Sequence, residues 1–355
     1  MYILVTGGIG QIGRTAVSQL LRHKHSVRIL DRAAEADIDP EVRAEIEGAS
    51  YAQVDITDFT SLAPHFAGAD AVVHLAALTT PGAGPEHVLF QINVNGTFNV
   101  YRAAADAGIQ RVVSASSINA LGYNYGIKSF DIEYFPIDEM HPTFTTDPYS
   151  FSKDMVEEIA GYFWRREGIS GAALRFPGVY RRNPQGTGRG RLDWRRMFRE
   201  AAESFSALPE EERMERMATV IAQLDAMRVE RPHEQPPEEQ RRQWEARRQQ
   251  GPPPPEMMLA WGRTDFWASM DDRDAAQAIE KALTVDYEGA HTLFVNDSHN
   301  SVGIPTQELT AMCFPQVKTW KQQVLGTETL VSIDKARELL GFEPAYSISL
   351  NKEVP

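Results

Sequence analysis

The sequence predicts an α/β protein whose core is a doubly wound parallel β-sheet. In the first half of the 355-residue chain, short runs of β-type residues alternate with amphipathic stretches at helical spacing. This rhythm is typical of repeated strand–helix–strand units. The first unit turns through glycines in the run VTGGIGQIGR, residues 5–14, which we call the glycine turn. Apolar residues make up 42% of the chain, enough for the core of one large domain or two smaller ones.

The predicted strands and helices follow one another in a regular order. Each strand is a short apolar run, and each helix carries apolar residues at intervals of three or four. Gly108 and Gly168 are expected to end two of the helices. We expect strands at 2–6, 26–31, 50–55, 70–76, 110–117 and 170–176, and helices at 11–23, 59–68, 87–108 and 149–168.

The composition changes in the second half of the chain. Residues 200–256 are rich in Glu, Arg, Gln and Pro, and 209–230 has the apolar spacing of an amphipathic helix. The prolines at 236, 237 and 252–255 are expected to break the structure that follows this helix. We call residues 200–256 the insertion. It is interpreted in one of two ways, as an inserted helical segment with a partly disordered tail, or as a lid or partner-binding arm. Ordered structure is expected again at 260–283, 291–297 and 333–342.

Bulk properties exclude several classes of function. The net charge of −13 would repel nucleic acids and anionic membranes. Cys313 is the single cysteine, so no internal disulfide forms and a reducing, cytoplasmic setting is predicted. The start MYILVTGG lacks the features of a signal peptide, and no apolar run is long enough to span a bilayer. The nine histidines show no spacing typical of metal ligands, so no metal is expected.

The glycine turn has the spacing of a phosphate-binding loop. Gly7, Gly10 and Gly13 lie three residues apart between the first strand and the first helix. Such glycines permit a tight turn, close approach of the backbone to a pyrophosphate, and close packing of helix on strand. Asp31, 18 residues after Gly13, can bind both hydroxyls of an adenosine ribose and repel a 2′-phosphate. A dinucleotide is predicted, with NAD favoured over NADP, although Arg32 could pair with such a phosphate.

Tyr149 and Lys153 stand four residues apart in the run DPYSFSK, residues 147–153. On a helix these two side chains share one face, a turn apart. The pair is either an active-site base with a cation that tunes it, or two ordinary residues on a solvated helix. Because the chain has eleven tyrosines, such a pair arises easily by chance. The surrounding motifs must decide between the two interpretations.

The order of several motifs resembles the extended short-chain dehydrogenase/reductases, the NAD-dependent epimerase/dehydratase family. The resemblance covers about 1–190 and 258–350 and leaves the insertion outside. It implies a Rossmann-type domain at 1–190 that carries the catalytic residues. A smaller substrate-binding lobe at 191–355 would include the insertion, and part of 260–300 would return to the sheet. Besides the glycine turn, the matching runs are VDI (54–56), HLAAL (74–78), NVNGT (93–97), SASSINALG (114–122), LRFPGVY (174–180), MDDRDAAQAI (270–279) and DKARELLGFEPAYS (334–347).

The resemblance also implies which residues bind NAD. In this family the third-strand motif contacts adenine, the fourth-strand motif lies along the dinucleotide, and the sixth-strand motif packs beside the nicotinamide. The implied cofactor-binding residues are Gly7, Gly10, Gln11, Ile12, Gly13, Asp31, Arg32, Asp55, Ile56, Leu75, Ala76, Ala77, Asn93, Tyr149, Lys153, Phe176 and Pro177.

Catalytic roles follow from the same resemblance. Ser117 matches the family's serine, Tyr149 its tyrosine and Lys153 its lysine, whereas Ser116 is expected to be a plain strand residue. Tyr149 would remove a hydroxyl proton as hydride leaves for NAD⁺, while Ser117 binds the reacting oxygen and Lys153 holds the nicotinamide ribose. A free phenol has a pKa of about 10. A base that works at neutral pH needs a pKa about three units lower, which corresponds to about 4 kcal/mol of stabilisation of the phenolate. One ammonium at about 4 Å can supply that, and the positive nicotinamide ring adds to it.

Departures from the family's motifs narrow the reaction. Ile118 and Asn119 stand where the family's 4,6-dehydratases carry an Asp–Glu pair, and its sugar-acid decarboxylases want a Glu in place of Asn119. Dehydration and decarboxylation are therefore disfavoured. Epimerisation through a transient ketone and net oxidation or reduction of one hydroxyl remain. The alternative from another class is a non-catalytic dinucleotide sensor that acts as a scaffold.

The residues after the sixth strand leave two substrate classes open, a nucleotide sugar and a free compound such as a sugar acid. Gly178 replaces an Asn that contacts the diphosphate in many nucleotide-sugar members, and Arg181 and Arg182 replace a Gly–Pro pair. These arginines either bind an anionic group of the substrate or lie in a solvated loop. Family members commonly dimerise through the helices at about 87–108 and 149–168, so a homodimer is expected. The implied substrate contacts are Thr79, Ser117, Asn119, Gly178, Arg181 and Arg182.

Overall fold

A parallel seven-stranded sheet forms the centre of the computed structural model. The structure describes residues 1–128, 130–181, 200–229, 242, 246 and 253–347. The strand order is β3-β2-β1-β4-β5-β6-β9, and every neighbouring pair runs parallel. The order reverses beside β1, which confirms the predicted doubly wound fold. The strands are β1 (Tyr2–Thr6), β2 (Ser26–Asp31), β3 (Ser50–Gln53), β4 (Ala71–His74), β5 (Arg111–Ser117), β6 (Ser170–Phe176) and β9 (Ala290–Phe294).

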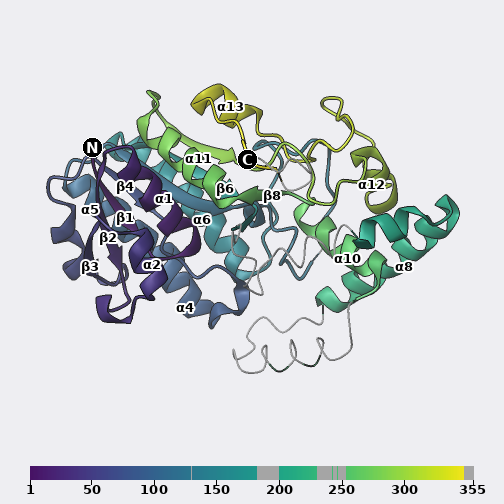
Figure 1. Ribbon diagram of the computed structural model, residues 1–355, viewed down its shortest axis with the longest axis horizontal. Coiled ribbons are helices and arrows are strands. Elements are labelled where there is room, and N and C mark those ends of the chain that lie inside the picture. Colours follow the sequence, from purple (N-terminus) through teal and green to yellow (C-terminus); the bar gives the residue numbers. More distant parts are fainter. Residues whose placement is uncertain (129, 182–199, 230–241, 243–245, 247–252, 348–355) are drawn as a thin grey trace.

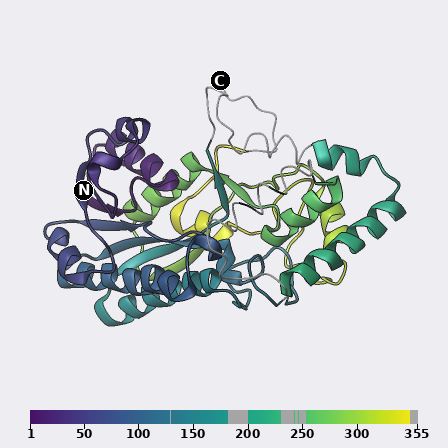
Figure 2. The ribbon, with the colours of Figure 1, turned by 90° about the horizontal axis from the view of Figure 1, so that it is seen from below.

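Helices cover both faces of this sheet (Figures 1 and 2). Ile3 and Val5 of β1 join a cluster with α1 (Gln11–Arg22) and α11 (Asp272–Thr284). Leu4 points the other way, into a cluster with α5 (Gly96–Asp106) and α6 (Pro148–Glu167). Because both faces are buried, the strands are continuous apolar runs rather than alternating ones.

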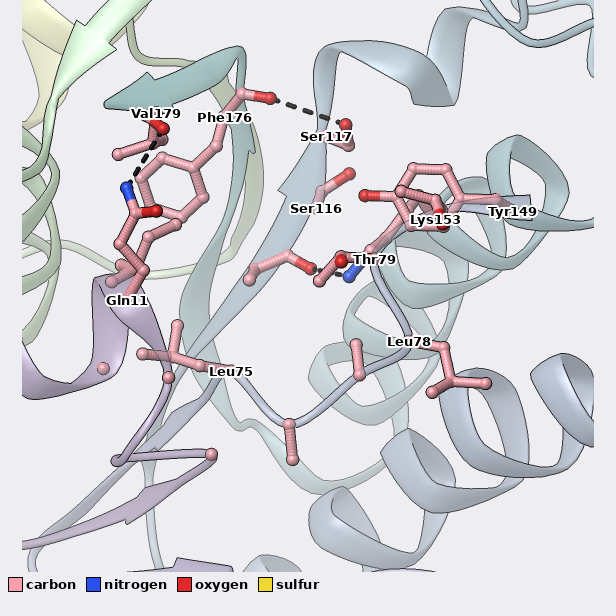
Figure 3. Close-up of a pocket in the computed structure, with 18 of the residues that line it drawn as sticks. Gln11, Leu75, Leu78, Thr79, Ser116, Ser117, Tyr149, Lys153, Phe176 and Val179 are labelled. Carbon is pink, nitrogen blue, oxygen red and sulfur yellow. Dashed lines mark hydrogen bonds between the residues drawn. The ribbon is translucent and has the colours of Figure 1, made fainter. Parts of the chain in front are cut away.

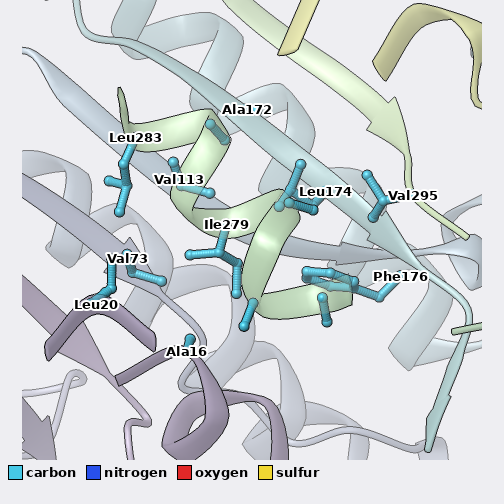
Figure 4. Close-up of a cluster of buried hydrophobic side chains, with 14 of the residues drawn as sticks. Ala16, Leu20, Val73, Val113, Ala172, Leu174, Phe176, Ile279, Leu283 and Val295 are labelled. Carbon is cyan, nitrogen blue, oxygen red and sulfur yellow. The ribbon is translucent and has the colours of Figure 1, made fainter. Parts of the chain in front are cut away.

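Part of the C-terminal half belongs to the sheet domain. α11 packs beside α1, and Figure 4 shows Ile279 and Leu283 of α11 against Val113 and Leu174 of the sheet. Each of these large apolar side chains contributes about 2–3 kcal/mol when removed from water. β9 extends the same sheet beside β6. The chain therefore leaves the sheet after β6 and returns to it about a hundred residues later.

A second lobe lies at the end of the molecule remote from β3 (Figure 1). It contains α8 (Glu210–Val229), α10 (Pro255–Gly262) and α12 (Thr306–Cys313), packed around a separate core rich in aromatic residues. A two-stranded sheet of β7 (Gly178–Tyr180) and β8 (Ser269–Asp271) lies where the chain passes between the lobes.

Several predicted elements differ from the observed ones. The helix expected at 87–108 is divided into α4 (Glu86–Phe90), a π-helical turn (Gln91–Asn95) and α5. The helix expected at 59–68 is α3 (Phe59–Leu62) followed by a 3₁₀ turn. Pro255 does not break structure but begins α10, because a proline at the first helical position has no N–H to satisfy. The helices α2 (Pro40–Glu45), α10 and α12 were not expected as separate elements, whereas α8 and α13 (Asp334–Leu340) agree with the predicted helices.

Within the described ranges, no helix has the length and apolar character needed to cross a membrane.

Candidate active site

A cleft of about 650 Å³ lies along the carboxyl ends of the sheet strands. This edge, at the point where strand order reverses, is where doubly wound sheets bind ligands. We call the part at the glycine turn and Asp31 the glycine end, and the part at Ser117, Tyr149 and Lys153 the tyrosine end. The predicted site residues that line the cleft are Gly7, Gly10, Gln11, Ile12, Gly13, Asp31, Arg32, Asp55, Ile56, Leu75, Ala76, Ala77, Thr79, Ser117, Asn119, Tyr149, Lys153, Phe176, Pro177 and Gly178.

The glycine turn leaves no room for a side chain at Gly7 or Gly13. Gly7 has φ +70°, and a Cβ there would lie 2.7 Å from the backbone nitrogen of Ala76. A Cβ on Gly13 would lie 2.3 Å from the carbonyl oxygen of Gly7. α1 begins directly after Gly10, and neither a capping side chain nor an acidic residue occupies its first turn. Its first N–H groups and the positive end of its dipole therefore fit the pyrophosphate of a dinucleotide.

The residues expected to bind the adenosine lie beyond this turn. Asp31 ends β2 and is partly buried, and its carboxylate accepts a 3.3 Å hydrogen bond from the N–H of Ala33. Arg32 is exposed beside it. Asp55 accepts 2.8 Å hydrogen bonds from the N–H and the hydroxyl of Thr57, which fixes the turn after β3. Ile56 is buried below this turn. These contacts fix the turns that carry the Asp31 and Asp55 carboxylates beside the buried Ile56.

Asn93 does not line the cleft but supports the loop that does. It is 1% exposed, and its side-chain oxygen accepts a 2.8 Å hydrogen bond from the N–H of Leu78. Its amide donates to the carbonyl of Leu78 at 2.9 Å and to Ser152 Oγ at 3.0 Å. It belongs to the π-helical turn, a distortion that is frequent at functional sites. Asn93 therefore ties the loop of Leu78 and Thr79 to α6.

The start of α6 places Tyr149 and Lys153 at the cleft. Asp147 caps this helix by accepting a 2.8 Å hydrogen bond from the N–H of Ser150, and Pro148 occupies the first helical position. Lys153 Nζ donates a 2.8 Å hydrogen bond to the carbonyl of Ala115 in β5. Figure 3 shows the Tyr149 hydroxyl pointing toward the end of β5, where Ser116 and Ser117 lie.

The two neighbouring serines have different partners. Ser116 Oγ donates a 2.5 Å hydrogen bond to Glu157, whose carboxylate forms a bidentate ion pair with Arg175 at 2.8 Å for both bonds. Ser117 Oγ accepts hydrogen bonds from the N–H and the amide of Asn119 at 3.1 and 3.3 Å and donates a weak 3.5 Å bond to the carbonyl of Phe176 (Figure 3). Only Ser117 retains a loosely held hydroxyl hydrogen that can turn to another acceptor.

Burial dominates the electrostatics of the tyrosine–lysine pair. Burial raises the pKa of Tyr149 above its ordinary value of 10, and a hydrogen bond with Ser117 lowers it in part. Burial lowers the pKa of Lys153 to about 8, while the charge of Glu157 raises it. The Lys153 ammonium lies 5.8 Å from the centre of the Tyr149 ring. The expected lowering of the Tyr149 pKa is therefore not met in the chain alone, because loss of hydration outweighs the hydrogen bond with Ser117.

Arg181, one of the two arginines that could bind an anionic substrate, is not brought to the cleft. Arg181 is not among the lining residues, and its guanidinium pairs with Glu45 at 2.7 Å and with Asp272 at 3.6 Å. It therefore joins the region of α2 to the start of α11. Arg182 lies outside the described residues. Gly178 and Asn119 do line the cleft, although the Asn119 side chain is engaged with Ser117.

Other cleft residues were missed by the sequence interpretation. Asn124 and Tyr125 reach the cleft from the segment after β5, and Asp265 reaches it from the second lobe. The ring of Tyr125 stands edge-on to that of Tyr149, with 5.7 Å between centroids. The aromatic character of 123–135 gave a partial signal for Tyr125. Asp265 gave none, because its place depends on contacts between segments far apart in the chain. In the part of the chain that the structure describes, no cluster of side chains has the makeup of a metal site.

The fold and the cleft define a Rossmann-type dinucleotide-binding protein. The chain belongs to the NAD dependent epimerase/dehydratase family, whose sequence model matches residues 3–212. This match confirms the resemblance found in the sequence, and with it NAD as the cofactor of an enzyme of this family.

Similar sequences include two kinds of sugar enzyme. The chain is 32% identical over 179 residues to L-arabinose 1-dehydrogenase (NAD(P)(+)) of Haloferax volcanii, a match that spans 49% of this chain and 65% of that protein. It is 34% identical over 166 residues to UDP-glucose 4-epimerase of Erwinia amylovora, across 45% of this chain and 47% of the relative. The matches thus span about half to two thirds of the relatives' length.

Solved structures share the fold over nearly the whole chain. A short-chain dehydrogenase/reductase superfamily protein from Agrobacterium tumefaciens with bound NAD has a TM-score of 0.59 at 19% identity, covering 98% of this chain and 94% of that one. UDP-glucose 4-epimerase from Thermotoga maritima with UDP-glucose has a TM-score of 0.59 at 17% identity, with 98% and 95% covered. At these identities the likeness is one of fold.

Proposed function

We propose that this protein is an NAD-dependent oxidoreductase or epimerase that acts on a secondary hydroxyl of a sugar or nucleotide sugar. The observation that carries this proposal is the shared cleft. Its glycine end has the backbone and carboxylate needed for the adenosine half of NAD, and its tyrosine end has a phenol, a hydroxyl and an ammonium within one turn of helix and one strand end. The similarity to an arabinose dehydrogenase and to a UDP-glucose epimerase supports both reactions.

Tyr149 is the proposed base. Its phenolate oxygen takes the proton of the substrate hydroxyl as the C–H bond of the carbinol carbon breaks and hydride departs. When bound, NAD⁺ supplies the hydride acceptor and a positive charge that favours ionisation of the buried phenol. Ser117 turns its loosely held hydroxyl from Phe176 to the reacting oxygen. Lys153 keeps one N–H on Ala115 and has two others for the hydroxyls of the nicotinamide ribose.

The residues beside Ser117 support oxidation or epimerisation over dehydration. Ile118 is buried and apolar, and Asn119 directs its backbone and side-chain N–H groups to Ser117. Elimination of water needs a further acid and a further base, which these two side chains do not supply. A dehydrogenase of a non-nucleotide compound such as a sugar acid is the first alternative, and a non-catalytic dinucleotide sensor is the second.

One assay separates these possibilities. Purified protein is incubated with NAD⁺ and UDP-glucose, L-arabinose or galacturonic acid, and both NADH absorbance and the isomer composition of the sugar are followed. NADH release indicates a dehydrogenase, whereas a new isomer without NADH release indicates an epimerase. Tight NAD binding with turnover of no sugar in a wider panel would contradict the proposal and favour the sensor.

A homodimer is the proposed assembly. Four aromatic side chains on α4, α5 and α6 are 36–44% exposed, which is unusual for such large apolar groups on one face. They form two pairs: Phe90 stacks on Phe151 with 6.0 Å between centroids, and Phe98 lies tilted against Tyr162 at 6.2 Å. A second copy of the chain would remove this face from water. A cytoplasmic location stays a prediction.

A further inference from the structure

The tyrosine end of the cleft contains a carboxylate that hydride transfer does not use. Asp265 ends a single 3₁₀ turn (Arg263–Asp265) that follows α10 and lines the same cleft as Tyr149. Burial raises the pKa of this carboxyl to about 7, although the N–H of Trp267 lowers it in part. Two other carboxylates line the described part of the cleft at the glycine end, where Asp31 ends β2 and Asp55 follows β3.

Contacts with the segment after β5 place Asp265 near the reacting groups. Thr264 Oγ1, one residue earlier, donates a 2.8 Å hydrogen bond to the side-chain oxygen of Asn124. Asn124 lines the cleft, and the next residue, Tyr125, packs edge-on to the Tyr149 ring. The turn that carries Asp265 is therefore joined to the same wall as the proposed base, from the opposite lobe.

The inserted helix α8 holds both of these segments. Arg263 is 5% exposed and donates a 3.0 Å hydrogen bond to the carboxylate of Asp225 on α8. Arg228, also on α8 and 4% exposed, donates a 2.9 Å hydrogen bond to the carbonyl of Tyr123. Both guanidinium groups lie over the Tyr123 ring, with Arg228 5.5 Å and Arg263 5.7 Å from its centre. The family match ends at residue 212, so nearly all of α8 lies beyond it.

We propose that Asp265 binds a hydrogen-bond-donating group of the substrate and that α8 positions it through Asp225 and Arg263. Above its pKa of about 7 the Asp265 carboxyl is ionised, and an ionised carboxylate accepts hydrogen bonds and repels phosphate or carboxylate. The group it takes is therefore a hydroxyl or an ammonium, so the part of the substrate at this end is a neutral or amino sugar rather than a sugar acid. This inference rests on the proposed function, because it names the specificity of the same site.

Asp265→Asn tests the contact with little change in shape. Asp286→Asn, an exposed aspartate after α11, is the matched control. The probes are L-arabinose, UDP-glucose, glucosamine and galacturonic acid, each measured for turnover and for binding to NAD-loaded protein. We expect Asp265→Asn to lower kcat/KM for the preferred sugar by about 10- to 100-fold, mainly through KM. The affinity for NAD should stay within about twofold of the wild type, because Asp265 lies away from the glycine end.

The outcomes separate this inference from the proposed function. Preference of the wild type for glucosamine, lost in the variant, identifies the bound group as an ammonium, whereas loss with a neutral sugar identifies a hydroxyl. A wild type that turns over a probe with kinetic constants that Asp265→Asn leaves unchanged overturns the inference alone. A wild type for which galacturonic acid is the preferred substrate overturns it too. A wild type that neither binds nor converts any probe overturns the inference together with the proposed function.

Asp225→Asn tests the positioning role of α8. Glu215→Gln, an exposed residue of the same helix, is its control. We expect Asp225→Asn to raise KM for the same probe by about 3- to 10-fold with kcat unchanged, and Asp225→Glu to restore part of the loss. A lower Tm with an unchanged KM would show that the ion pair only stabilises the lobe, which would overturn this half of the proposal.

Discussion

The two ends of the cleft are built from different parts of the chain. The glycine end is mainly backbone: Gly7, Gly13 and the first turn of α1 lie in a single short segment, to which Asp31 and Asp55 add carboxylates. The tyrosine end is made of side chains that come from β5, α6, the segment after β5 and the second lobe. A site made of backbone N–H groups does not tolerate an added side chain, and it binds one common ligand group, phosphate. A side-chain site can change its ligand by single substitutions.

The ends also differ in what burial does to them. At the tyrosine end, Tyr149 and Lys153 are nearly inaccessible to water. Burial raises the pKa of Tyr149 and lowers the pKa of Lys153, so it favours the neutral form of both side chains. At the glycine end, Asp31 is only partly buried and Arg32 is exposed. Substitutions at the tyrosine end should therefore change chemistry and pH dependence, whereas those at the glycine end should change cofactor affinity.

The largest expected effect follows from Tyr149→Phe. Loss of the phenol removes the proposed base while the ring keeps its packing against Tyr125. We expect kcat to fall by about 10²- to 10⁴-fold with NAD affinity unchanged. Steady-state kinetics and NAD titration measure the two quantities, and Tyr162→Phe, an exposed tyrosine of the same helix, serves as the control. Full activity in Tyr149→Phe would show that Tyr149 is not the base.

Lys153→Met should change how stability depends on pH. The pKa of Lys153 in the folded chain is about 8, below the ordinary 10.5, so folding releases a proton between these values. The free energy of unfolding of the wild type, relative to Lys153→Met, should therefore rise with pH from about 8, by about 3 kcal/mol in total.

Chemical denaturation of both proteins between pH about 7 and about 10 measures this difference, from which the ionisation of tyrosines that the two proteins share cancels. A difference that stays constant, or that falls as pH rises, would show that Lys153 is not a buried cation with a lowered pKa.

Gly13→Ala tests the glycine end. The added Cβ would lie 2.3 Å from the Gly7 carbonyl oxygen, so the turn must open and its N–H groups move. We expect the Kd for NAD to rise by about tenfold or more, whereas kcat at saturating NAD falls much less than in Tyr149→Phe.

Gly161→Ala is the control for this substitution, because its Cβ would meet only the flexible end of Arg165. Isothermal titration with NAD⁺ measures the affinities. An unchanged Kd in Gly13→Ala would mean that the cofactor does not use this turn.

The smallest expected effect concerns the dimer. Phe151 is 42% exposed and stacks on Phe90. Phe151→Ser removes apolar area from the proposed interface, so the dimer Kd should rise by about tenfold with little change in NAD affinity. Sedimentation velocity over a range of concentrations reports it. A wild type that is monomeric at all concentrations would contradict the proposed assembly.

Features with local signals were predicted from the sequence. The alternation of strands and helices, the glycine turn and Asp31 each depend on residues that lie close together in the chain, and the structure has the sheet and the cleft where these signals placed them. Tyr149 and Lys153 share a helix face because their spacing is fixed by one helical turn.

Features that depend on distant residues were not predicted. Arg181 was named as a possible substrate contact, but it forms an ion pair with Glu45, 136 residues away in the chain. Asp265 reaches the cleft because Thr264 bonds to Asn124, 140 residues earlier. The π-helical turn at Asn93 was not predicted, because so short a run of sequence has no apolar spacing that distinguishes it from an α-helix. In each case tertiary contacts, which no local pattern encodes, decide the outcome.

The most direct test of the account follows a labelled hydrogen. UDP-glucose deuterated at the C4 carbon and L-arabinose deuterated at C1 are each converted in the presence of NAD⁺, and the products are analysed by mass spectrometry. Hydride transfer predicts that the deuterium appears in NADH or stays on the carbon of an inverted sugar. Turnover should be slower than with the unlabelled compound, and in Tyr149→Phe it should be lower by about 10²- to 10⁴-fold. Loss of the deuterium to water during turnover would contradict hydride transfer at the tyrosine end.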